Sequence, residues 1–406
     1  MSEAGVAPPV VLTGYHHVMA AYRNRSLRQA LFDEGLVMQD VLINLHGDEH
    51  RARRRLENRL FRRDTFEHYE RELFPGIIAA TLAPHVAHGR AELVSLGHQL
   101  MMNLGALSAG IDRPAGTQAE TLRLYELMMV FIEGATIANF LGDRVALEAR
   151  VAVALDEFAT TFLEPSRRRR LALLSAVDRG EASDADVPRD VLTVLLRNVD
   201  RLALPDDVVL RETAFFLLSG THTTATSFTR TMHALFGFLA DHPESAGLVH
   251  DPVLVQRAVH EVLRLQPPSP VRRRRAIERT TVGDGLRIEK GTIVDLDLML
   301  ANRDPGVFGP DAHRFNPFRP PLGDAPPWGT SFGTGMHACI GQDMAAGTLP
   351  DDAGDRFDRL FGVVPAAVSA MFEWDVRTDP HDPPVLDPMT SRGYFKRYPV
   401  RFDTGP

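Results

Sequence analysis

The sequence contains a single cysteine, Cys339, among 406 residues. One thiol cannot form an internal disulfide, which suits a protein of a reducing compartment such as the cytoplasm. One thiol also cannot hold an iron–sulfur cluster, although it can be one ligand of a single metal centre. Hydrophobic residues make up 44% of the chain, so a large apolar core is expected to supply the stability instead.

Long apolar runs and excess positive charge are missing as well. No stretch reaches the roughly 18 apolar residues that cross a bilayer, and residues 1–9 contain neither a basic nor a long apolar segment. The formal net charge is −8, from 45 basic and 53 acidic side chains, which gives no general case for nucleic-acid binding. These absences predict a cytoplasmic protein whose partners include neither nucleic acid nor membrane.

The pattern of apolar residues and chain breakers predicts a mainly α protein with small β-sheets, in one domain over residues 1–406. Up to about residue 245 it indicates helices separated by short breaks, with a long, central helix from about 205 to 239. A second clear helix is expected over 252–265. Short strands are expected at 280–282, 286–288 and 292–296, where glycines separate β-branched residues.

The cysteine lies in Ser331-Phe-Gly-Thr-Gly-Met-His-Ala-Cys339-Ile-Gly341. Gly333 and Gly335 permit a tight hairpin, and a helix starting at or just after Cys339 would favour the thiolate. A lone cysteine is often a small buried hydrophobe. A catalytic nucleophile would need a positioned histidine base, and His337, two residues away in a turn, is poorly spaced for it. The third possibility is an axial ligand of haem iron.

This segment resembles the cysteine-ligand loop of bacterial cytochrome P450 enzymes, a pattern with several fixed positions around the thiol. The matching residues are Phe332, Gly335, His337, Cys339, Gly341 and Ala345. The resemblance implies the cytochrome P450 fold, haem b (iron protoporphyrin IX) as the cofactor, and Cys339 as its iron ligand.

A charged triad is implied by the same resemblance. Glu261 and Arg264 stand three residues apart in the helix expected over 252–265, which by itself indicates an ordinary surface pair. In the family, this pair joins an arginine of a later Phe-x-Pro-x-Arg segment, here Arg319. Burial of the triad would fix the segment that leads to the cysteine loop.

The middle of the long helix contains Ser219-Gly-Thr-His-Thr-Thr224. Hydroxyls in such a run commonly bond back to carbonyls of the preceding turn. The run also resembles the family's oxygen-activation groove, in which Gly220 would make room for dioxygen and Thr223 would supply a hydroxyl. His222 stands where the family has Asp or Glu, and it would either relay protons in place of the acid or disturb the relay.

Basic residues near the start of the chain allow several interpretations. The segment His46-Gly-Asp-Glu-His50 matches an inverted zinc-protease motif with Glu49 as its acid, but Gly47 and Asp48 are poor helix formers and a third ligand is missing. A solvated basic helix face is the plain alternative. The resemblance implies instead that His50 and Arg54 bind haem propionates.

Other basic and histidine residues allow similar predictions. The resemblance implies that Arg274, in a run of four arginines, and His337 bind propionates, and that Arg272 lines the substrate pocket, where an anionic substrate would suit it. A second run, 167–170, is expected on a solvated helix. His16 and His17 are expected in a strand, pointing to opposite faces, and receive no role.

The resemblance covers residues 10–346, with two departures. The helix and strands that open the family's chains are absent before residue 10, so the expected fold is N-terminally short. After Ala346 the family has a continuous helix, which Pro350 would break here, so residues 347–406 are expected to diverge.

The resemblance implies a haem-thiolate monooxygenase that inserts one atom of dioxygen into a C–H bond of a small organic substrate, by hydroxylation, demethylation or epoxidation. Electrons are expected from a separate ferredoxin and ferredoxin reductase, because no redox domain is fused to this chain. A peroxygenase, an isomerase or a sensor that needs no NAD(P)H electrons is the alternative. The residues expected to contact substrate are Phe215, Leu218, Ser219, Val271 and Arg272.

Overall fold

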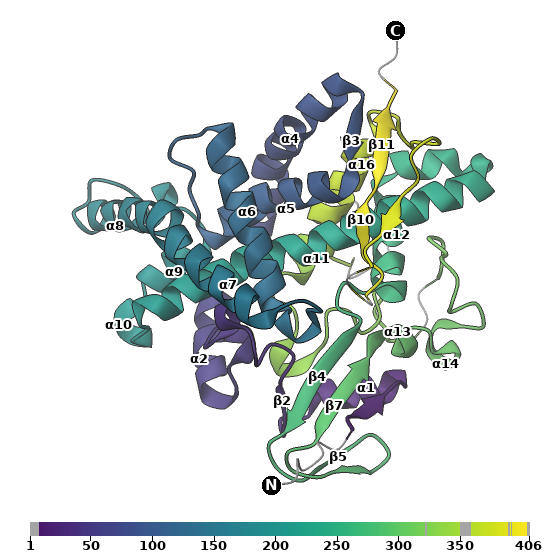
Figure 1. Ribbon diagram of the computed structural model, residues 1–406, viewed down its shortest axis with the longest axis horizontal. Coiled ribbons are helices and arrows are strands. Elements are labelled where there is room, and N and C mark those ends of the chain that lie inside the picture. Colours follow the sequence, from purple (N-terminus) through teal and green to yellow (C-terminus); the bar gives the residue numbers. More distant parts are fainter. Residues whose placement is uncertain (1–7, 321–322, 350–358, 389, 391, 404–406) are drawn as a thin grey trace. The chain divides into compact units, whose positions relative to one another are not determined.

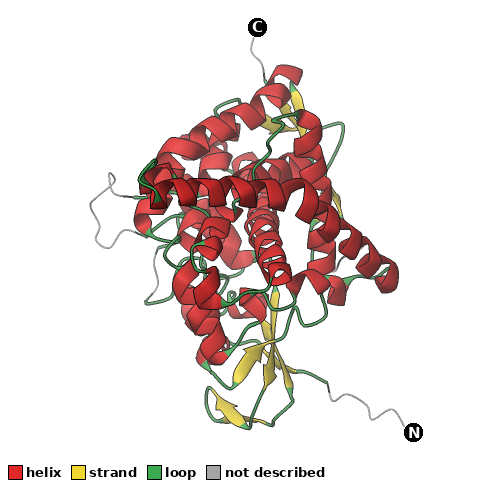
Figure 2. Cartoon of the chain, turned by 90° about the vertical axis from the view of Figure 1, so that its left-hand side faces the viewer, coloured by secondary structure: helices red, strands yellow, loops and turns green. Residues whose placement is uncertain are grey.

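The computed structural model describes residues 8–320, 323–349, 359–388, 390 and 392–403. The chain divides into two compact units, each built from two segments that are distant in the sequence. Unit 1 comprises Met1–Leu31 and Arg230–Gln342, and unit 2 comprises Phe32–Thr229 and Asp343–Pro406. Most of the described residues are helical, and the strands are short (Figure 2). The mainly α fold with small sheets is therefore confirmed, whereas the single domain over 1–406 stays a prediction.

The helices follow the expected pattern (Figure 1). Those of unit 1 are α1 (Tyr15–Arg23), α12 (Pro252–Leu265), α13 (Leu298–Ala301) and α14 (Pro305–Phe308). Those of unit 2 are α2 (Gly47–Glu57), α3 (Arg63–His68), α4 (Phe74–His88), α5 (Leu93–Ala109), α6 (Gln118–Ala135), α7 (Arg144–Phe158), α8 (Glu164–Asp178), α9 (Val191–Leu196), α10 (Val199–Leu202) and α16 (Val363–Phe372). Two helices have residues in both units, α11 (Asp206–Asp241) and α15 (Gln342–Ala346). The predictions of a long helix from about 205 to 239 and of a helix over 252–265 are confirmed.

Four strands of unit 1 form a mixed sheet in the order β1-β7-β4-β2. Their bounds are β1 (Val10–Leu12), β2 (Leu27–Gln29), β4 (Val271–Ala276) and β7 (Ile293–Asp297). β1 runs parallel to β7, and the other neighbours are antiparallel. β5 (Thr280–Val282) pairs with β6 (Leu286–Ile288) in a separate hairpin. The predicted strands are confirmed, with the last one shifted by a single residue.

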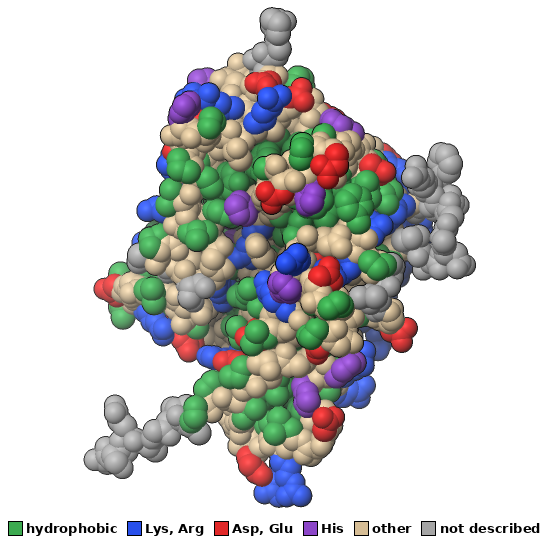
Figure 3. Space-filling view, turned by 90° about the vertical axis from the view of Figure 1, so that its right-hand side faces the viewer, with side chains coloured by type: hydrophobic (Ala, Val, Ile, Leu, Met, Phe, Trp, Pro, Cys, Tyr) green, Lys and Arg blue, Asp and Glu red, His purple; other side chains and the backbone are tan. Residues whose placement is uncertain are grey.

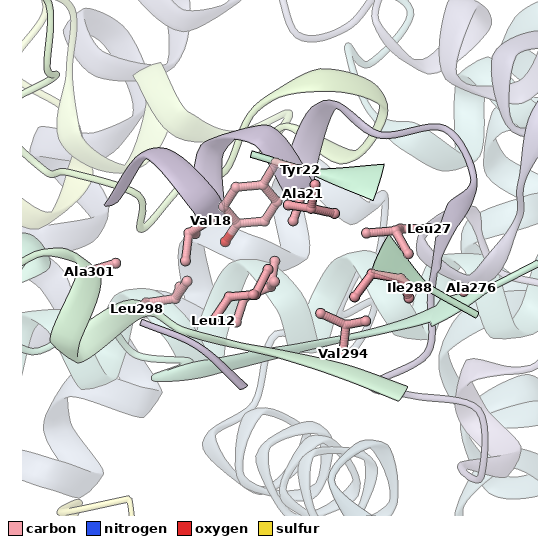
Figure 4. Close-up of a cluster of buried hydrophobic side chains, with 12 residues drawn as sticks. Leu12, Val18, Ala21, Tyr22, Leu27, Ala276, Ile288, Val294, Leu298 and Ala301 are labelled. Atoms are coloured by element: carbon pink, nitrogen blue, oxygen red, sulfur yellow. The ribbon is translucent and has the colours of Figure 1, made fainter. Parts of the chain in front are cut away.

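The core of unit 1 lies between α1 and these strands. In Figure 4, Val18 and Ala21 of α1 point toward Leu12, Leu27 and Val294 of the sheet. All five side chains are buried, which removes apolar surface from water and holds the helix on the sheet.

This packing corrects the prediction that His16 and His17 lie in a strand, because both belong to α1. Strand β1 ends at Leu12, and the helix that follows buries residues at helical spacing, among them Tyr15 and Val18. His17 contacts the exposed Asp284 at 3.7 Å. The spacing of the apolar residues around the two histidines, and not the histidines themselves, determines the structure here.

In unit 2, α5 packs closely against the middle of α11. A Cβ placed on Gly97 would lie 2.9 Å from the ring of Phe228, and one on Gly105 would lie 3.0 Å from the Thr221 hydroxyl. Because Gly97 faces Phe228 while Gly105 faces Thr221, the two helices run antiparallel. Glycine at both positions permits this close approach of the helices.

The arginine run 167–170 corrects another prediction, because it does not lie wholly on a solvated helix face. Arg170 of α8 is 2% exposed. Its guanidinium pairs with Asp190 at 2.7 Å and with Asp112 at 2.9 Å. A buried arginine is tolerated because these two carboxylates satisfy its charge and its N–H groups.

The chain after Ala346 departs from a continuous helix, as predicted. α15 ends at Ala346, and the next helix, α16, begins at Val363. Glu70 accepts hydrogen bonds of 2.8 Å from the backbone N–H groups of Phe361 and Gly362, just before α16. Pro350, to which the break was attributed, lies outside the described residues.

The C-terminal residues of unit 2 contribute two small sheets. One has the order β3-β11-β8, from β3 (Arg90–Glu92), β11 (Pro399–Phe402) and β8 (Val376–Thr378). The other pairs β9 (Val385–Leu386) with β10 (Phe395–Arg397). Residues 347–406 thus add ordered elements to unit 2 where the chain is described.

Candidate active site

The cysteine loop of unit 1 is a tight turn that leaves the thiol exposed. Gly333 and Gly335 have φ angles of +65° and +72°, which favour glycine. The backbone N–H of Cys339 donates to the carbonyl of Phe332 at 2.9 Å and closes the loop. Cys339 is exposed, so the interpretation as a small buried hydrophobe is wrong. α15 begins three residues later, at Gln342.

Asn302 ties this loop to α12. Its side-chain amide donates to the carbonyl of Arg264 at 2.8 Å and to the Ser331 hydroxyl at 3.2 Å. Its side-chain oxygen accepts from the backbone N–H of Thr330 at 2.7 Å. The residue is completely buried, and its bonds fix where the loop leaves the body of unit 1. Nothing in the spacing of the sequence singles out this asparagine.

Tyr22 of α1 is a second support that the sequence did not reveal. A Cβ on Gly335 would lie 2.8 Å from the Tyr22 carbonyl oxygen, and one on Gly333 would lie 3.3 Å from its ring. The Tyr22 hydroxyl donates to the carbonyl of Thr330 at 3.3 Å. Burial raises the pKa of Tyr22, against the opposing effects of Arg272 and Arg274. The close approach explains why the loop needs glycine at both positions.

Arg274 of β4 is a buried cation that lacks an anionic partner among the described residues. Its guanidinium donates to the side-chain oxygen of Gln29 and to the carbonyl of Arg273, and it lies 5.4 Å from the centre of the Tyr22 ring. Burial lowers its pKa to about 10, an effect that Tyr22 opposes and Arg272 adds to. Since a buried charge is costly unless it is paired, this position suits an anionic group of a bound molecule.

The predicted triad comes together within unit 1. The Arg264 guanidinium makes two bonds of 2.7 Å to the Glu261 carboxylate. Arg319 donates to the same carboxylate at 3.0 Å and pairs with Asp311 at 2.7 Å. Side-chain exposure is 0% for Arg264, 4% for Glu261 and 9% for Arg319. The pair therefore is not the surface pair that its spacing alone suggests.

In unit 2, α11 opens around Gly220. This glycine is exposed although Leu218 and Thr221 beside it are buried, and a Cβ built on it would meet no atom within 4 Å. The Thr223 hydroxyl donates to the carbonyl of Ser219 at 2.8 Å, which is the back-bonding expected of such hydroxyls. The helix thus leaves space beside Gly220 without a break in its hydrogen bonding.

His222 lies beside this opening and contacts a histidine of α5. Nδ1 of His222 lies 3.4 Å from Nε2 of His98, and the two rings are stacked with centroids 5.7 Å apart. The ring of Tyr394 meets His222 edge-on at 5.4 Å. His98 was not recognised in the sequence, because a histidine within an apolar helix carries no signal of its own.

The predicted propionate ligands of unit 2 lie on α2. His50 is 2% exposed, and burial, together with the charge of Arg54 and other neighbours, lowers its pKa to about 4. Arg54 donates to the side-chain oxygen of Asn58 at 2.8 Å. Within the described residues, no group of three or more His, Cys, Asp or Glu side chains could hold a metal ion.

The residues expected to contact substrate differ in exposure. Phe215 and Leu218 are 7% and 6% exposed and pack within unit 2. Ser219 of unit 2 and Val271 and Arg272 of unit 1 are half-buried and so retain accessible surface.

The candidate residues fall into two sets. Unit 1 contains Arg274, Phe332, Gly335, His337, Cys339 and Gly341, and unit 2 contains His50, Arg54, Gly220, His222 and Thr223.

Positive and negative side chains are interspersed on the face shown in Figure 3. Over the described part of the chain, no helix has both the length and the apolar character needed to span a membrane.

The sequence is similar to known proteins over much of its length. The family model described as Cytochrome P450 matches residues 252–349. Pulcherriminic acid synthase from Bacillus subtilis is 28% identical over 338 residues, which are 80% of this chain and 76% of that protein. 6-Deoxyerythronolide B hydroxylase from Saccharopolyspora erythraea is 37% identical over 129 residues, or 32% of this chain and 29% of that protein.

Solved structures extend the similarity of fold to nearly the whole chain. HmtT, involved in himastatin biosynthesis, has a TM-score of 0.73 at 22% identity, covering 98% of this chain and 95% of that one. P450BioI, solved with a fatty-acyl-ligated acyl carrier protein, has a TM-score of 0.69 at 20% identity, covering 98% and 93%. This coverage extends past Ala346, the end of the segment in which the sequence resembles the family, into the later residues that the structure describes.

Proposed function

Because the chain belongs to the cytochrome P450 family, we propose that it inserts one atom of dioxygen into a C–H bond of a small organic substrate. The chain is a cytochrome P450 monooxygenase, its cofactor is haem, and it needs a redox partner. The finer proposal is that a separate ferredoxin and its reductase deliver the electrons, and that the outcome is hydroxylation, demethylation or epoxidation.

The observation that carries the proposal is the exposed Cys339 on an anchored loop. A thiolate is a strong electron donor to iron, and the side chain is accessible to a ligand. Arg274 of the same unit supports the assignment, because it is a buried cation with only neutral hydrogen-bond acceptors among the described residues. An exposed thiol and a cation suited to a carboxylate are the donor set that a haem thiolate site requires.

The proposed ligands divide by chemistry. Cys339 would hold the iron, while Arg274 and His337 of unit 1, and His50 and Arg54 of unit 2, would bind propionates. When bound, the haem supplies the activation of dioxygen, and the protein supplies orientation, protons and exclusion of water. Phe332, Gly335 and Gly341 would shape the loop around the thiolate.

Proton delivery is assigned to the opening in α11. Gly220 leaves space beside the helix, and Thr223 holds its hydroxyl against the Ser219 carbonyl. We assign the proton relay to His222, because an imidazole titrates near neutrality and transfers protons at either nitrogen. Thr223 would hold a proton at its hydroxyl oxygen, next to His222 in the helix.

Substrate contacts are proposed for Ser219, Val271 and Arg272, which retain accessible surface. Arg272 favours an anionic substrate. Matched carboxylic acids and their methyl esters, compared for the spectral shift each causes on binding, test this preference. Arg272→Gln is expected to weaken the binding of the acids and to leave the binding of the esters unchanged. Equal weakening of binding for both would contradict an ionic contact.

The central test is the absorption of the reduced, carbon-monoxide-bound protein. The wild type is expected to give the red-shifted band of thiolate ligation, Cys339→Ser to lose it, and the loop control Met336→Leu to keep it. An unshifted band in the wild type would contradict the proposal. Turnover with ferredoxin, its reductase and NAD(P)H is expected, whereas turnover with hydrogen peroxide alone would favour a peroxygenase.

A further inference from the structure

Two histidines of unit 2 form a pair with defined hydrogen-bonding directions. His98 of α5 lies with Nδ1 2.9 Å from the carbonyl oxygen of Val94, four residues earlier. Its other nitrogen, Nε2, lies 3.4 Å from Nδ1 of His222 in α11. His98 is 8% exposed, so its hydrogen bonds are made within the protein and not with bulk water.

The position of each proton follows from these contacts. A carbonyl oxygen only accepts, so Nδ1 of His98 must carry the proton that it donates to Val94. In a neutral imidazole the other nitrogen is then an acceptor, which makes Nε2 of His98 the acceptor of the pair. Nδ1 of His222 must therefore be the donor, and the Nε2 atom of His222 becomes its basic nitrogen.

We propose that His98 is a positioning residue that holds His222 in the tautomer with its proton on Nδ1, so that His222 accepts and releases protons at Nε2. The inference rests on the proposed function, because it specifies how His222 would take part in proton delivery. It assigns a role to His98, for which the sequence carries no signal.

A histidine in this position needs such a partner more than a carboxylate would. The two oxygens of a carboxylate are equivalent acceptors, so rotation does not change what the group offers. A neutral imidazole accepts at only one of its two nitrogens, and the wrong tautomer would present a donor where an acceptor is required. A hydrogen bond from the second nitrogen is the usual way in which proteins fix this choice.

The surroundings favour the neutral form of His98 and contact the His222 ring. Burial lowers the pKa of His98, more than the bond to Val94 and the charge of Glu92 raise it. The edge of Tyr394 contacts the His222 ring at an angle of 83°, and the Tyr394 hydroxyl accepts from Arg392 at 3.4 Å. The charged side chains linked to the pair by these contacts are Glu92, through its charge on His98, and Arg392, through Tyr394.

The packing of α5 against α11 fixes the positions of His98 and His222 relative to each other. Gly97, the residue before His98, packs against Phe228 of α11, and Gly105 packs against Thr221. Both contacts are tighter than a larger residue would allow, so the two helices are held at a fixed distance on either side of the histidine pair.

The test is nitrogen NMR of the holoenzyme labelled at histidine, recorded in the diamagnetic ferrous carbon-monoxide form. In the wild type, His222 is expected to show a pyrrole-like Nδ1 and a pyridine-like Nε2. His98→Leu is expected to change this pattern, while His98→Gln, whose amide oxygen can accept from His222, is expected to preserve it. His222→Gln assigns the resonances.

A matched control comes from the neighbouring helix. His85 of α4 is half-buried and hydrogen-bonded to Gln99 of α5, so His85→Leu removes a nearby histidine and leaves both members of the pair in place. The control is expected to leave the His222 resonances unchanged. If His98→Leu also leaves them unchanged, or if the wild type carries the proton on Nε2, the inference is overturned.

A kinetic readout separates this inference from the function on which it rests. His98→Leu is expected to keep the red-shifted carbon-monoxide band but to lower turnover by about 10-fold, as loss of an outer partner of a functional histidine typically does, with KM unchanged. His98→Gln should recover most of that loss. Loss of the band in the wild type would overturn the proposed function, whereas normal turnover of His98→Leu would overturn only the role of His98.

Discussion

The guanidinium of Arg264 and the carboxylate of Glu261 form two hydrogen bonds of 2.7 Å within one turn of α12. Neither side chain is accessible to solvent beyond 4%. A buried ion pair offsets the cost of removing its two charges from water only when the donors and acceptors of both side chains have hydrogen-bond partners. The pair serves to position Arg319 and the segment before the cysteine loop.

Glu261→Gln is therefore expected to destabilise the protein strongly. The substitution leaves the charges of Arg264 and Arg319 without their shared carboxylate, and breaking a buried pair in this way costs about 3–5 kcal/mol. Chemical unfolding of the wild type and the variant measures the loss directly.

The exposed pair Arg279 and Glu289 provides the control for this prediction. Its atoms are 3.0 Å apart, but the side chains are 75% and 62% exposed. Glu289→Gln is expected to cost less than about 1 kcal/mol. If Glu261→Gln is as mild as Glu289→Gln, the triad does not lock the structure.

The parts of the structure that the sequence predicted are those determined by nearby residues. The apolar spacing of 252–265 and the stop at Gln266 are sufficient to define α12, and the glycines around Cys339 are sufficient to indicate a tight loop. The strands of 280–282 and 286–288 follow from short runs between glycines. In each case the determining interactions lie within a few residues along the chain.

The residues that were missed owe their roles to contacts between distant segments. Tyr22 supports a loop more than 300 residues away, and His98 meets a partner 124 residues away. The sequence predicts a solvated Arg170 because its two carboxylate partners, Asp112 and Asp190, are on other segments. A pattern read along the chain contains no information about such pairs.

Gly335→Ala tests the fit between α1 and the cysteine loop. The new Cβ would lie 2.8 Å from the Tyr22 carbonyl, at a residue whose φ is +72°. Backbone and neighbour must both shift, so a loss of about 1–3 kcal/mol in unfolding free energy is expected. A weaker red-shifted carbon-monoxide band per mole of protein is also expected.

Gly237→Ala is the matched control in a regular helix. A Cβ at Gly237 of α11 would meet nothing within 4 Å, and alanine favours a helix over glycine by up to about 1 kcal/mol. This variant should be as stable as the wild type or slightly more so. A wild-type band and wild-type stability in Gly335→Ala would show that the loop tolerates displacement from α1.

Glu57 and Glu212 of unit 2 are expected to make the stability of the protein fall as pH rises. Both are fully buried beside Arg53, whose guanidinium donates to Glu212 at 2.8 Å. Burial, and next the charge of Glu212, raise the pKa of Glu57 well above its ordinary value of 4.5. Glu57 therefore keeps its proton to higher pH in the folded protein than in the unfolded chain, so stability falls as pH rises above about 4.5.

Glu57→Gln mimics the protonated carboxyl and is expected to remove this part of the pH dependence. At pH 8 the variant should be more stable than the wild type by about 1–3 kcal/mol, the cost of a buried group without its partner. Unfolding measured at pH 5, 6.5 and 8 checks the slope. Glu67→Gln, at a partly exposed pair with Arg63, should leave the slope intact, and an unchanged slope in Glu57→Gln would contradict the assignment.

His50 is expected to act in the opposite direction in the haem-free protein. Its pKa is about 4 in the fold and 6.5 in an unfolded chain, so between these values the unfolded chain binds more protons and stability rises with pH. Without haem, His50→Phe should flatten this rise by about 1–2 kcal/mol, as measured by unfolding at pH 4.5, 5.5 and 6.5. The exposed His381→Asn is the control and should keep the slope of the wild type.

Haem loading should reverse the effect if a propionate lies at His50, because a nearby anion raises the pKa of an imidazole. A slope in His50→Phe equal to that of the wild type would show that His50 does not titrate with a lowered pKa in the folded protein.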